Sequence, residues 1–297
     1  MKPIPITLRQ IDYVIASADT GSTAAAARLL SVSQPSVSLA IAKVEAHLGR
    51  PLFARAAGQG VLPTAFGRLK LGELRQLRAR AERVLVVGDA TPDVMDLGVF
   101  STLGPRYAPA LVRRFEQAHP GTRIRLHEGD IEALSNWLES GQINVALTYD
   151  FGLPSTCHIM PLANVRPYGL LPAGHRLAGR NEVTLAELLC DPLILMSLPQ
   201  SRGYFLTLAQ MHGVTPQIAY ETGSVEMLRS MVANGMGVGL MATDIPHGTA
   251  YDGGAIIRMP LAGDLVAHRI ALVRSKRLQT DAVTQAFCRY AANFFEG

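Results

Sequence analysis

Cysteine is scarce in this chain. Only three occur among its 297 residues, Cys157, Cys190 and Cys288, and they are widely spaced with no C-x-x-C pair. An odd number of isolated cysteines argues against a disulfide framework and against a zinc knuckle, and it fits reduced thiols. We therefore expect neither a structural disulfide nor a metal site.

Long apolar runs are also lacking. The longest, VLVV at 84–87 and MGVGLMA at 236–242, fall far short of the ~18 residues that a membrane-spanning helix needs. Near the amino terminus, Arg9 and Asp12 interrupt the chain before the apolar core of a signal peptide could form. These absences predict a cytoplasmic protein with no membrane partner.

Common catalytic motifs are missing as well. The sequence has no G-x-S-x-G elbow, no Walker loop and no H-E-x-x-H pair. Gly235, Gly237 and Gly239 follow a predicted helix and lead into a predicted strand, which reverses the order that cradles a phosphate. His127 and Glu128 would point to opposite faces of a strand, which disfavours a metal site. We expect neither an enzyme nor a cofactor.

Charge, by contrast, is unevenly distributed along the chain. Apolar residues make up 48% and charged residues 18%, as in an ordinary globular protein, and the net charge is +4. Residues 1–88 hold twelve Lys or Arg against five Asp or Glu, a net charge of +7, whereas the remainder carries −3. A basic amino-terminal unit on a mildly acidic body indicates nucleic-acid binding by the first unit.

Three short helices are predicted in the first fifty residues. Thr7 and Gln10 form a capping box for the first, Ser22 caps the second, and Ser33 caps a third with Pro35 in its first turn. Four apolar residues of the third helix share one stripe, namely Val37, Ile41, Val44 and Leu48. Two short helices joined by a tight turn indicate a helix-turn-helix, with a purely structural bundle as the alternative.

A wing and a long helix are expected next. Short apolar runs on both sides of the glycine-containing turn at 58–60 predict a small hairpin. From residue 64 to about residue 87 the pattern is helical and basic, with an apolar seam of Leu74, Leu77, Ala81 and Val84. The spacing is typical of a coiled coil and predicts pairing with a second copy. The alternative is a solvated helix packed on its own domain.

The first 55 residues resemble the DNA-binding domain of LysR-type transcriptional regulators. The likeness runs without a gap from Leu8 to Arg55 and includes the landmarks Ser33-Gln34-Pro35 and Leu52-Phe53-x-Arg55. It implies that the third helix faces DNA and that Arg55 touches phosphate from the wing. The predicted DNA-binding residues are Ser33, Gln34, Pro35, Ser36, Ser38, Leu39, Lys43 and Arg55.

Two positions depart from the family pattern. Leu39 and Ala42 stand where members of the family often carry basic or long polar residues. Leucine can contact a thymine methyl group but cannot form the bidentate pair that arginine makes with guanine. We therefore expect weaker phosphate anchoring or a different base preference.

Beyond a turn-rich segment at 88–93, strand-like runs alternate with helical ones. This alternation predicts βαβ units, mainly parallel sheets and two similar lobes. The stretches LGVFSTLGPRYAPALVRRFEQAHPG and LESGQINVALTYD resemble the family's effector domain, which has the fold of periplasmic solute-binding proteins. The likeness implies that residues 94–165 and 270–297 form lobe I and that residues 166–269 form lobe II.

The predicted fold class is therefore α/β with three units. They are a winged helix-turn-helix at 1–63, a linker and dimerisation helix at 64–88, and a two-lobed periplasmic-binding-protein-like effector domain at 94–297. In such a fold a ligand lies between the lobes, at strand carboxyl ends and helix amino termini, where free amides favour an anion.

The predicted effector-binding residues are Ser101, Thr102, Leu103, Tyr149, Ser201, Arg202, Thr222 and Gly223. Each hydroxyl taken alone is more often a helix cap, and only their convergence favours a ligand site. Arg202 adds a positive charge if it points inward. The favoured effector is a small carboxylate.

The resemblance implies a transcriptional regulator that senses a small metabolite and alters DNA binding or bending at a dyad operator. Its implied partners are double-stranded DNA and further copies of the chain in a homodimer or homotetramer, and RNA polymerase is another candidate. The alternative is a constitutive DNA-binding regulator with no physiological effector. A solute-binding protein is disfavoured because no export signal is expected.

Overall fold

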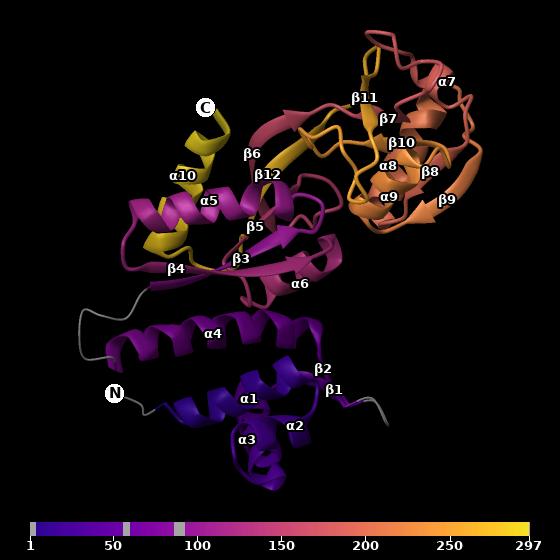
Figure 1. Cartoon of the computed structure of the whole chain (residues 1–297). Coiled ribbons are helices and arrows are strands. Elements are labelled where there is room, and N and C mark those ends of the chain that lie inside the picture. The colour runs from indigo at the N-terminus through magenta and orange to yellow at the C-terminus, as the bar shows by residue number, and fades with distance from the viewer. Residues whose placement is uncertain (1–3, 56–59, 86–92, 297) are drawn as a thin grey trace.

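The computed structural model describes residues 4–55, 60–85 and 93–296, apart from the side chains of Arg55 and Arg83. Figure 1 shows an amino-terminal helical unit, a first lobe and a second lobe arranged one after another. The long helix α4 (Ala65–Leu85) lies between the helical unit and the first lobe and contacts both. No helix in the described ranges is both long and apolar enough to cross a membrane.

Three helices and a hairpin form the amino-terminal unit. They are α1 (Leu8–Thr20), α2 (Thr23–Leu29), α3 (Gln34–Leu48), β1 (Phe53–Arg55) and β2 (Val61–Pro63). The predicted caps are confirmed, because Thr7, Ser22 and Ser33 each accept a hydrogen bond from the backbone of the following helix. The helices close over a shared apolar core in which Val14, Val37 and Val44 are fully buried.

The first lobe is a five-stranded sheet in the order β4-β3-β5-β12-β6. Its strands are β3 (Asp93–Phe100), β4 (Thr122–Gly129), β5 (Val145–Tyr149), β6 (Cys157–Val165) and β12 (His268–Ser275). Helices α5 (Gly104–Ala118), α6 (Ile131–Glu139) and α10 (Ala282–Glu296) pack against it. Every residue of β5 is buried, as expected for a central strand covered on both faces.

The second lobe repeats this plan with the strand order β11-β7-β10-β8-β9. Its strands are β7 (Tyr168–Pro172), β8 (Leu193–Met196), β9 (Ile218–Thr222), β10 (Val238–Met241) and β11 (Ile256–Pro260). Its helices are α7 (Leu185–Leu188), α8 (Pro199–Met211) and α9 (Val225–Ala233). The two lobes have separate apolar cores.

Both sheets are mixed, whereas the sequence pattern predicted mainly parallel ones. In the first lobe β3 pairs in parallel with β4 and β5, but β12 pairs antiparallel with β5 and β6. In the second lobe β7 pairs antiparallel with β10 and β11. The antiparallel strands are those that carry the chain between the lobes, at 166–167 and again at 261–267. The strand that follows each crossing, β7 or β12, therefore runs antiparallel to its neighbours in the sheet that it joins.

Candidate functional site

The outer face of α3 presents most of the predicted DNA-facing residues. Its inner face buries Val37, Ala40, Ile41 and Val44. The outer face and first turn expose Ser33, Gln34, Pro35, Ser36, Leu39 and Lys43, with Ser38 half-buried beside them. Leu39 is 58% exposed, so its side chain is accessible to a partner. The structure therefore brings these seven residues together on one accessible surface.

Hydrogen bonds orient the side chains at the start of α3. The side-chain amide nitrogen Nε2 of Gln34 donates to Ser38 Oγ at 3.0 Å and to Thr23 Oγ1 of α2 at 3.2 Å. The hydroxyl oxygens of Ser33 and Ser36 lie 2.7 Å apart. These contacts restrict the Gln34 rotamer before DNA binds, and a glutamine amide is a suitable bidentate partner for adenine.

The wing is held to α3 by one carboxylate. Glu45 Oε1 accepts hydrogen bonds from the backbone amides of Leu52 at 2.7 Å and Phe53 at 3.1 Å. The two strands of the predicted hairpin pair antiparallel, with Phe53 opposite Pro63. The side chain of Arg55 and residues 56–59 lie outside the described part of the chain, so the phosphate contact of Arg55 stays a prediction.

Helix α4 has one face packed on the rest of the chain and an exposed apolar seam. Leu74 is half-buried against the amino-terminal core, and Arg78 pairs with Asp12 of α1 at 2.8 Å. On the exposed side of the same helix, Leu77 and Val84 are 50% and 78% exposed. Packing on the chain's own domain thus describes one face of α4, whereas pairing with a second copy stays a prediction that rests on the exposed seam.

The same helix joins the amino-terminal unit to the first lobe. Arg75 binds Asp19 of α1 and also donates to the carbonyl oxygen of Ser140, just after α6, at 2.6 Å. Gly72 approaches this turn so closely that a Cβ atom there would lie 3.0 Å from the carbonyl oxygen of Glu139. Helix α4 therefore contacts both α1 and the turn that follows α6.

A pocket lies between the lobes, where several strands end. Its polar lining residues are Thr102, Tyr149, Ser201, Thr243 and His268, and its apolar wall consists of Met196, Phe205, Val225, Leu240, Met241 and Ala242. The cavity itself is small, about 20 Å³, which is little more than one water molecule occupies, so side chains largely fill the space between the lobes in this arrangement. Tyr149 Oη of the first lobe and Thr243 Oγ1 of the second lie 2.8 Å apart and join the two sides.

Three of the predicted effector residues line this pocket, namely Thr102, Tyr149 and Ser201. Leu103 does not line it, because its side chain is fully buried in the core of the first lobe. Arg202 does not line it either. Its guanidinium pairs with Glu221 at 3.2 Å on the protein surface. The side chain therefore does not point into the pocket, which was the condition for it to add a positive charge there.

The remaining three predicted residues lie at strand ends near the pocket without lining it. Ser101 follows β3 and is half-buried. Thr222 ends β9, and its hydroxyl accepts a hydrogen bond from the amide of Ser224 at 3.2 Å, so it serves the turn before α9. Gly223 is exposed in that turn.

Sequence reasoning missed two polar residues of the pocket, Thr243 and His268. Thr243 follows β10 and could have been selected by the rule that selected Ser101, since the strand itself was recognised. His268 begins β12, which runs antiparallel to β5, so its amino end lies where Tyr149 ends the neighbouring strand. A rule that considers only carboxyl ends of strands does not find such a residue.

Two helices that begin near the pocket lack a side-chain cap, and of the two only α8 contributes a first-turn residue, Ser201, to the pocket lining. No side chain caps α5 or α8, whereas α1, α2, α3, α6, α7 and α9 all have one. In α8 the first helical hydrogen bond runs from the backbone amide of Arg202 to the carbonyl oxygen of Leu198. The backbone amides of Gln200 and Ser201 come before it and have no acceptor within the helix. Uncapped amides and the helix dipole both favour an anion at this point.

The pocket side chains are uncharged at neutral pH. Among the described residues no Lys, Arg, Asp or Glu lines the pocket. Burial raises the pKa of Tyr149 to about 12, although hydrogen bonds from Thr243 and Thr102 oppose this shift. Burial alone lowers the pKa of His268 to about 4. An acidic ligand would therefore be held by amide and hydroxyl groups rather than by an ion pair.

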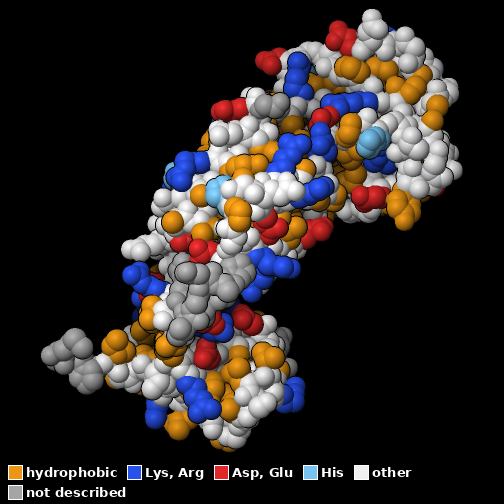
Figure 2. All heavy atoms as spheres, turned by 60° about the vertical axis from the view of Figure 1, so that its left-hand side comes forward, with side chains coloured by type: hydrophobic (Ala, Val, Ile, Leu, Met, Phe, Trp, Pro, Cys, Tyr) orange, Lys and Arg blue, Asp and Glu red, His pale blue; other side chains and the backbone are white. Residues whose placement is uncertain are grey.

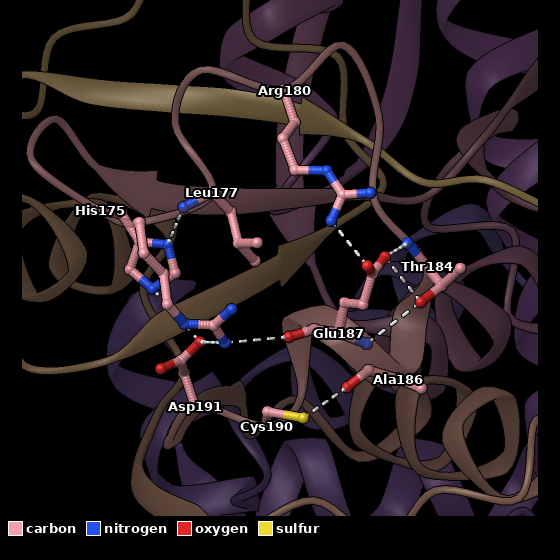
Figure 3. Close-up of polar contacts among 9 residues, drawn as sticks. His175, Leu177, Arg180, Thr184, Ala186, Glu187, Cys190 and Asp191 are labelled. Carbon is pink, nitrogen blue, oxygen red and sulfur yellow. Dashed lines mark hydrogen bonds and ion pairs between the residues drawn. The ribbon is translucent and has the colours of Figure 1, made fainter.

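A second polar cluster, around α7, has a structural explanation (Figure 3). Glu187 completes a capping box with Thr184 and also binds Arg180 at 2.6 Å. The Thr184 backbone bond is the largest cause that lowers the pKa of Glu187 to about 2, followed by Arg180. The thiol of Cys190 donates to the carbonyl oxygen of Ala186. These contacts brace the loop before α7.

Charge on the visible surface is mixed in sign. On the face drawn in Figure 2, basic side chains are dispersed among acidic, apolar and uncharged groups over the lobes and the amino-terminal unit. Within the described residues, no group of three or more His, Cys, Asp or Glu side chains is arranged to hold a metal ion.

A winged helix-turn-helix joined by a long helix to a two-lobed α/β domain with an interlobe pocket is the architecture of a DNA-binding regulator with an effector-binding domain. Residues 8–68 match the family model described as the bacterial regulatory helix-turn-helix protein, lysR family, and residues 93–296 match the LysR substrate binding domain. The chain therefore belongs to the LysR family of transcriptional regulators, which are not enzymes.

Individual relatives extend over nearly the whole chain. The crystal structure of HinK, a LysR family transcriptional regulator from Pseudomonas aeruginosa, is 35% identical, covers 98% of each chain and has a TM-score of 0.65. The transcriptional activator protein LysR of Escherichia coli is 25% identical over 95% of this chain and 91% of its own length. The regulator TfdS of Cupriavidus pinatubonensis is 30% identical over 80% of this chain and 82% of its own.

Proposed function

We propose that this regulator binds a small carboxylate between its lobes and thereby alters how it binds or bends double-stranded DNA at a dyad operator. The observation that carries the proposal is the convergence at one pocket of the uncapped amino terminus of α8 with the hydroxyls of Thr102 and Ser201. Amide and hydroxyl donors can hold a carboxylate without a basic side chain.

Signal transmission follows from the contacts between the units. Ligand binding shifts the population of lobe arrangements only through a difference in affinity for them. The first lobe contacts α4 through Arg75 and through the close approach of Gly72. A change in the position of this lobe would therefore move α4 and, with it, the DNA-binding unit. The functional units we assign are 1–63, 64–88 and 94–297, with lobe I at 94–165 and 270–297 and lobe II at 166–269.

The assembly we propose is a homodimer through α4, with two dimers forming a homotetramer on DNA. The exposed apolar seam at Leu77 and Val84 supports the dimer contact. The tetramer and a contact with RNA polymerase rest on the family alone. We place its action in the cytoplasm, because bacterial chromosomal DNA is located there.

Base reading is assigned to the outer face of α3. Gln34 and Ser38 supply hydrogen bonds, Leu39 supplies an apolar contact and Lys43 supplies charge. In footprinting at the native operator, Gln34→Ala should remove sequence selectivity while leaving the oligomer intact. The exposed Gln117→Ala in α5 is the matched control. Unchanged footprints for Gln34→Ala would contradict this assignment.

Charge supplies the second test of the DNA interface. Among the groove-facing residues of α3 only Lys43 is basic, so few phosphates are neutralised there. We expect a shallow dependence of operator affinity on salt compared with relatives that carry arginine at the positions of Leu39 and Ala42. A slope as steep as theirs would contradict weaker anchoring.

Effector binding is tested on the whole protein by thermal denaturation against a library of small carboxylates. A ligand at about 100 times its Kd stabilises the folded state by about 2.7 kcal/mol, which is readily detected. The Ser201→Ala variant should lose most of that shift. Transcription from the target promoter with and without the hit then decides whether binding regulates.

A constitutive regulator is the second candidate, and the close packing of the pocket favours it. Tyr149, Phe205, Met241 and Thr243 are each less than 5% exposed. Under this alternative no carboxylate raises the denaturation temperature, and transcription does not respond to any of them.

A further inference from the structure

His268 lies at the junction of the two lobes. It is the first residue of β12, directly after the second crossing, and it pairs with Val165 at the end of β6, just before the first crossing. Its side chain is 6% exposed and lines the interlobe pocket. A residue at this position contacts both lobes and the ligand space at once.

Aromatic rings from both lobes surround His268. The ring centroid of Tyr204, in α8 of the second lobe, lies 3.6 Å away. Those of Phe151 and Tyr149, in the first lobe, lie 4.6 Å and 4.9 Å away. The Tyr204 hydroxyl donates to the carbonyl oxygen of Val266 at 2.6 Å, and the Tyr149 hydroxyl is bonded to Thr243. Neither hydroxyl is therefore committed to the imidazole.

The imidazole itself has no polar partner among the described residues. Its pKa is lowered by burial alone, with no hydrogen bond or neighbouring charge contributing. Arg269, the residue after His268, pairs with Asp150 at the end of the neighbouring strand β5. Buried polar groups are normally satisfied, so an unpaired neutral imidazole on a pocket wall is available to a ligand.

We propose that His268 is the specificity-determining residue of the pocket, and that the effector presents an uncharged hydrogen-bonding group to it, such as a hydroxyl or an amide. This inference rests on the proposed carboxylate site, and it assigns the chemical group at the other end of the same ligand. A charged group is disfavoured at this end because the surrounding rings would leave its charge desolvated and uncompensated.

The spacing along α8 supports a ligand held at two points. Ser201, beside the uncapped amides, lies three residues before Tyr204, which is a rise of about 4.5 Å along α8. The ring of Tyr204 packs at a tilt against His268, so the helix places the two anchors at neighbouring levels of the pocket. Phe205, Met196 and Met241 form the apolar wall between them. A small ring with its acidic group at one end and a neutral polar group at the other matches this order of polar, apolar and polar groups, and the lobes must separate to admit it.

The test is a series of para-substituted benzoates titrated calorimetrically into the full-length protein at pH 7.5. The probes are benzoate, 4-hydroxybenzoate and terephthalate, which carry at the far end a hydrogen, a neutral hydroxyl and a second carboxylate. We expect 4-hydroxybenzoate to bind about three- to tenfold more tightly than benzoate, which is the usual effect of one hydrogen bond. Terephthalate should bind more weakly than benzoate.

Two variants localise this preference to the imidazole. His268→Phe keeps a ring against Tyr204 and should bind benzoate within about threefold of the wild type, but it should lose the preference for the hydroxyl. His268→Gln restores a neutral hydrogen-bonding group and should recover part of it. The ranking of the three probes on the wild-type protein needs neither variant, so it remains decisive if both fail to fold.

The possible failures are distinguishable. If benzoate binds but the wild type ranks the three probes equally, or if His268→Phe keeps the hydroxyl preference, the role of His268 is refuted and the carboxylate site survives. If none of the probes binds the wild type, the carboxylate site is refuted, and the role of His268 falls with it.

Discussion

Replacing His268 by phenylalanine should remove a large part of the acid sensitivity of the lobes. The imidazole has an ordinary pKa of about 6.5 in the unfolded chain, and burial lowers it to about 4 in the folded one. At pH 7 both states are neutral. As the pH falls below 6.5 the unfolded state binds a proton that the folded state refuses, so unfolding becomes more favourable until the pH passes below 4.

The size of the effect follows from the same two pKa values. A difference of about 2.5 units corresponds to about 3 kcal/mol once the pH is below both values, and about 2 kcal/mol of it develops between pH 7 and pH 5. The wild type should therefore lose about 2 kcal/mol more unfolding free energy over this interval than His268→Phe. At pH 7 the two proteins should differ little, because the new ring occupies the same aromatic site.

Urea unfolding followed by tryptophan fluorescence measures this difference. Trp137 is the only tryptophan and lies in α6 of the first lobe, so its signal reports the domain that contains His268. The other seven histidines are common to both proteins and cancel in the comparison. Protein concentration is held constant, because self-association would otherwise shift the midpoint. Equal losses in the two proteins between pH 7 and pH 5 would refute the reasoning.

Three further substitutions test the amino-terminal unit and α4. Glu45→Ala leaves two buried wing amides without their acceptor and should lower the unfolding free energy by about 1–3 kcal/mol in chemical denaturation, whereas Glu45→Gln should lose less. Leu77→Glu should weaken self-association in sedimentation equilibrium, and Ala79→Glu, on another face of α4, should not. Gly67→Ala places a Cβ atom 1.9 Å from the Leu52 carbonyl oxygen and should lower the melting temperature, while Gly179→Ala, with open space around it, should have little effect.

The helical parts of the fold were the easiest to predict, because their signals are local. Ser33 before a helix with Pro35 in its first turn specifies where α3 begins, and the stripe of Val37, Ile41 and Val44 specifies which face is buried. Those two facts already place Gln34 and Lys43 on the accessible side. The exposed seam of α4 followed from spacing in the same way, although nothing in one chain tests its partner.

The pocket was predicted only in part, because its residues come from segments far apart in sequence. Strand ends identified Thr102, Tyr149 and Ser201, which do line it. The direction of a side chain was not available from spacing, so Arg202 was considered for the site although it pairs with Glu221 on the surface. The same limitation explains the expectation of mainly parallel sheets, since strand direction depends on where each connection crosses.

The amino-acid sequence by itself determined the helix boundaries, the outward face of α3 and the separation of a basic amino-terminal unit from the body, because capping and periodicity act over a few residues. The scarcity of cysteine, the short apolar runs and the missing catalytic motifs can also be read directly from the sequence. They argued against a disulfide framework, a membrane-spanning protein and an enzyme with a common catalytic motif. Only the tertiary structure decided which groups meet between the lobes. His268 contacts Tyr149 and Tyr204 there because β12 runs antiparallel to β5, which places the first residue of β12 beside the last residue of β5. These two strands are more than a hundred residues apart in the sequence, so no local pattern encodes their pairing.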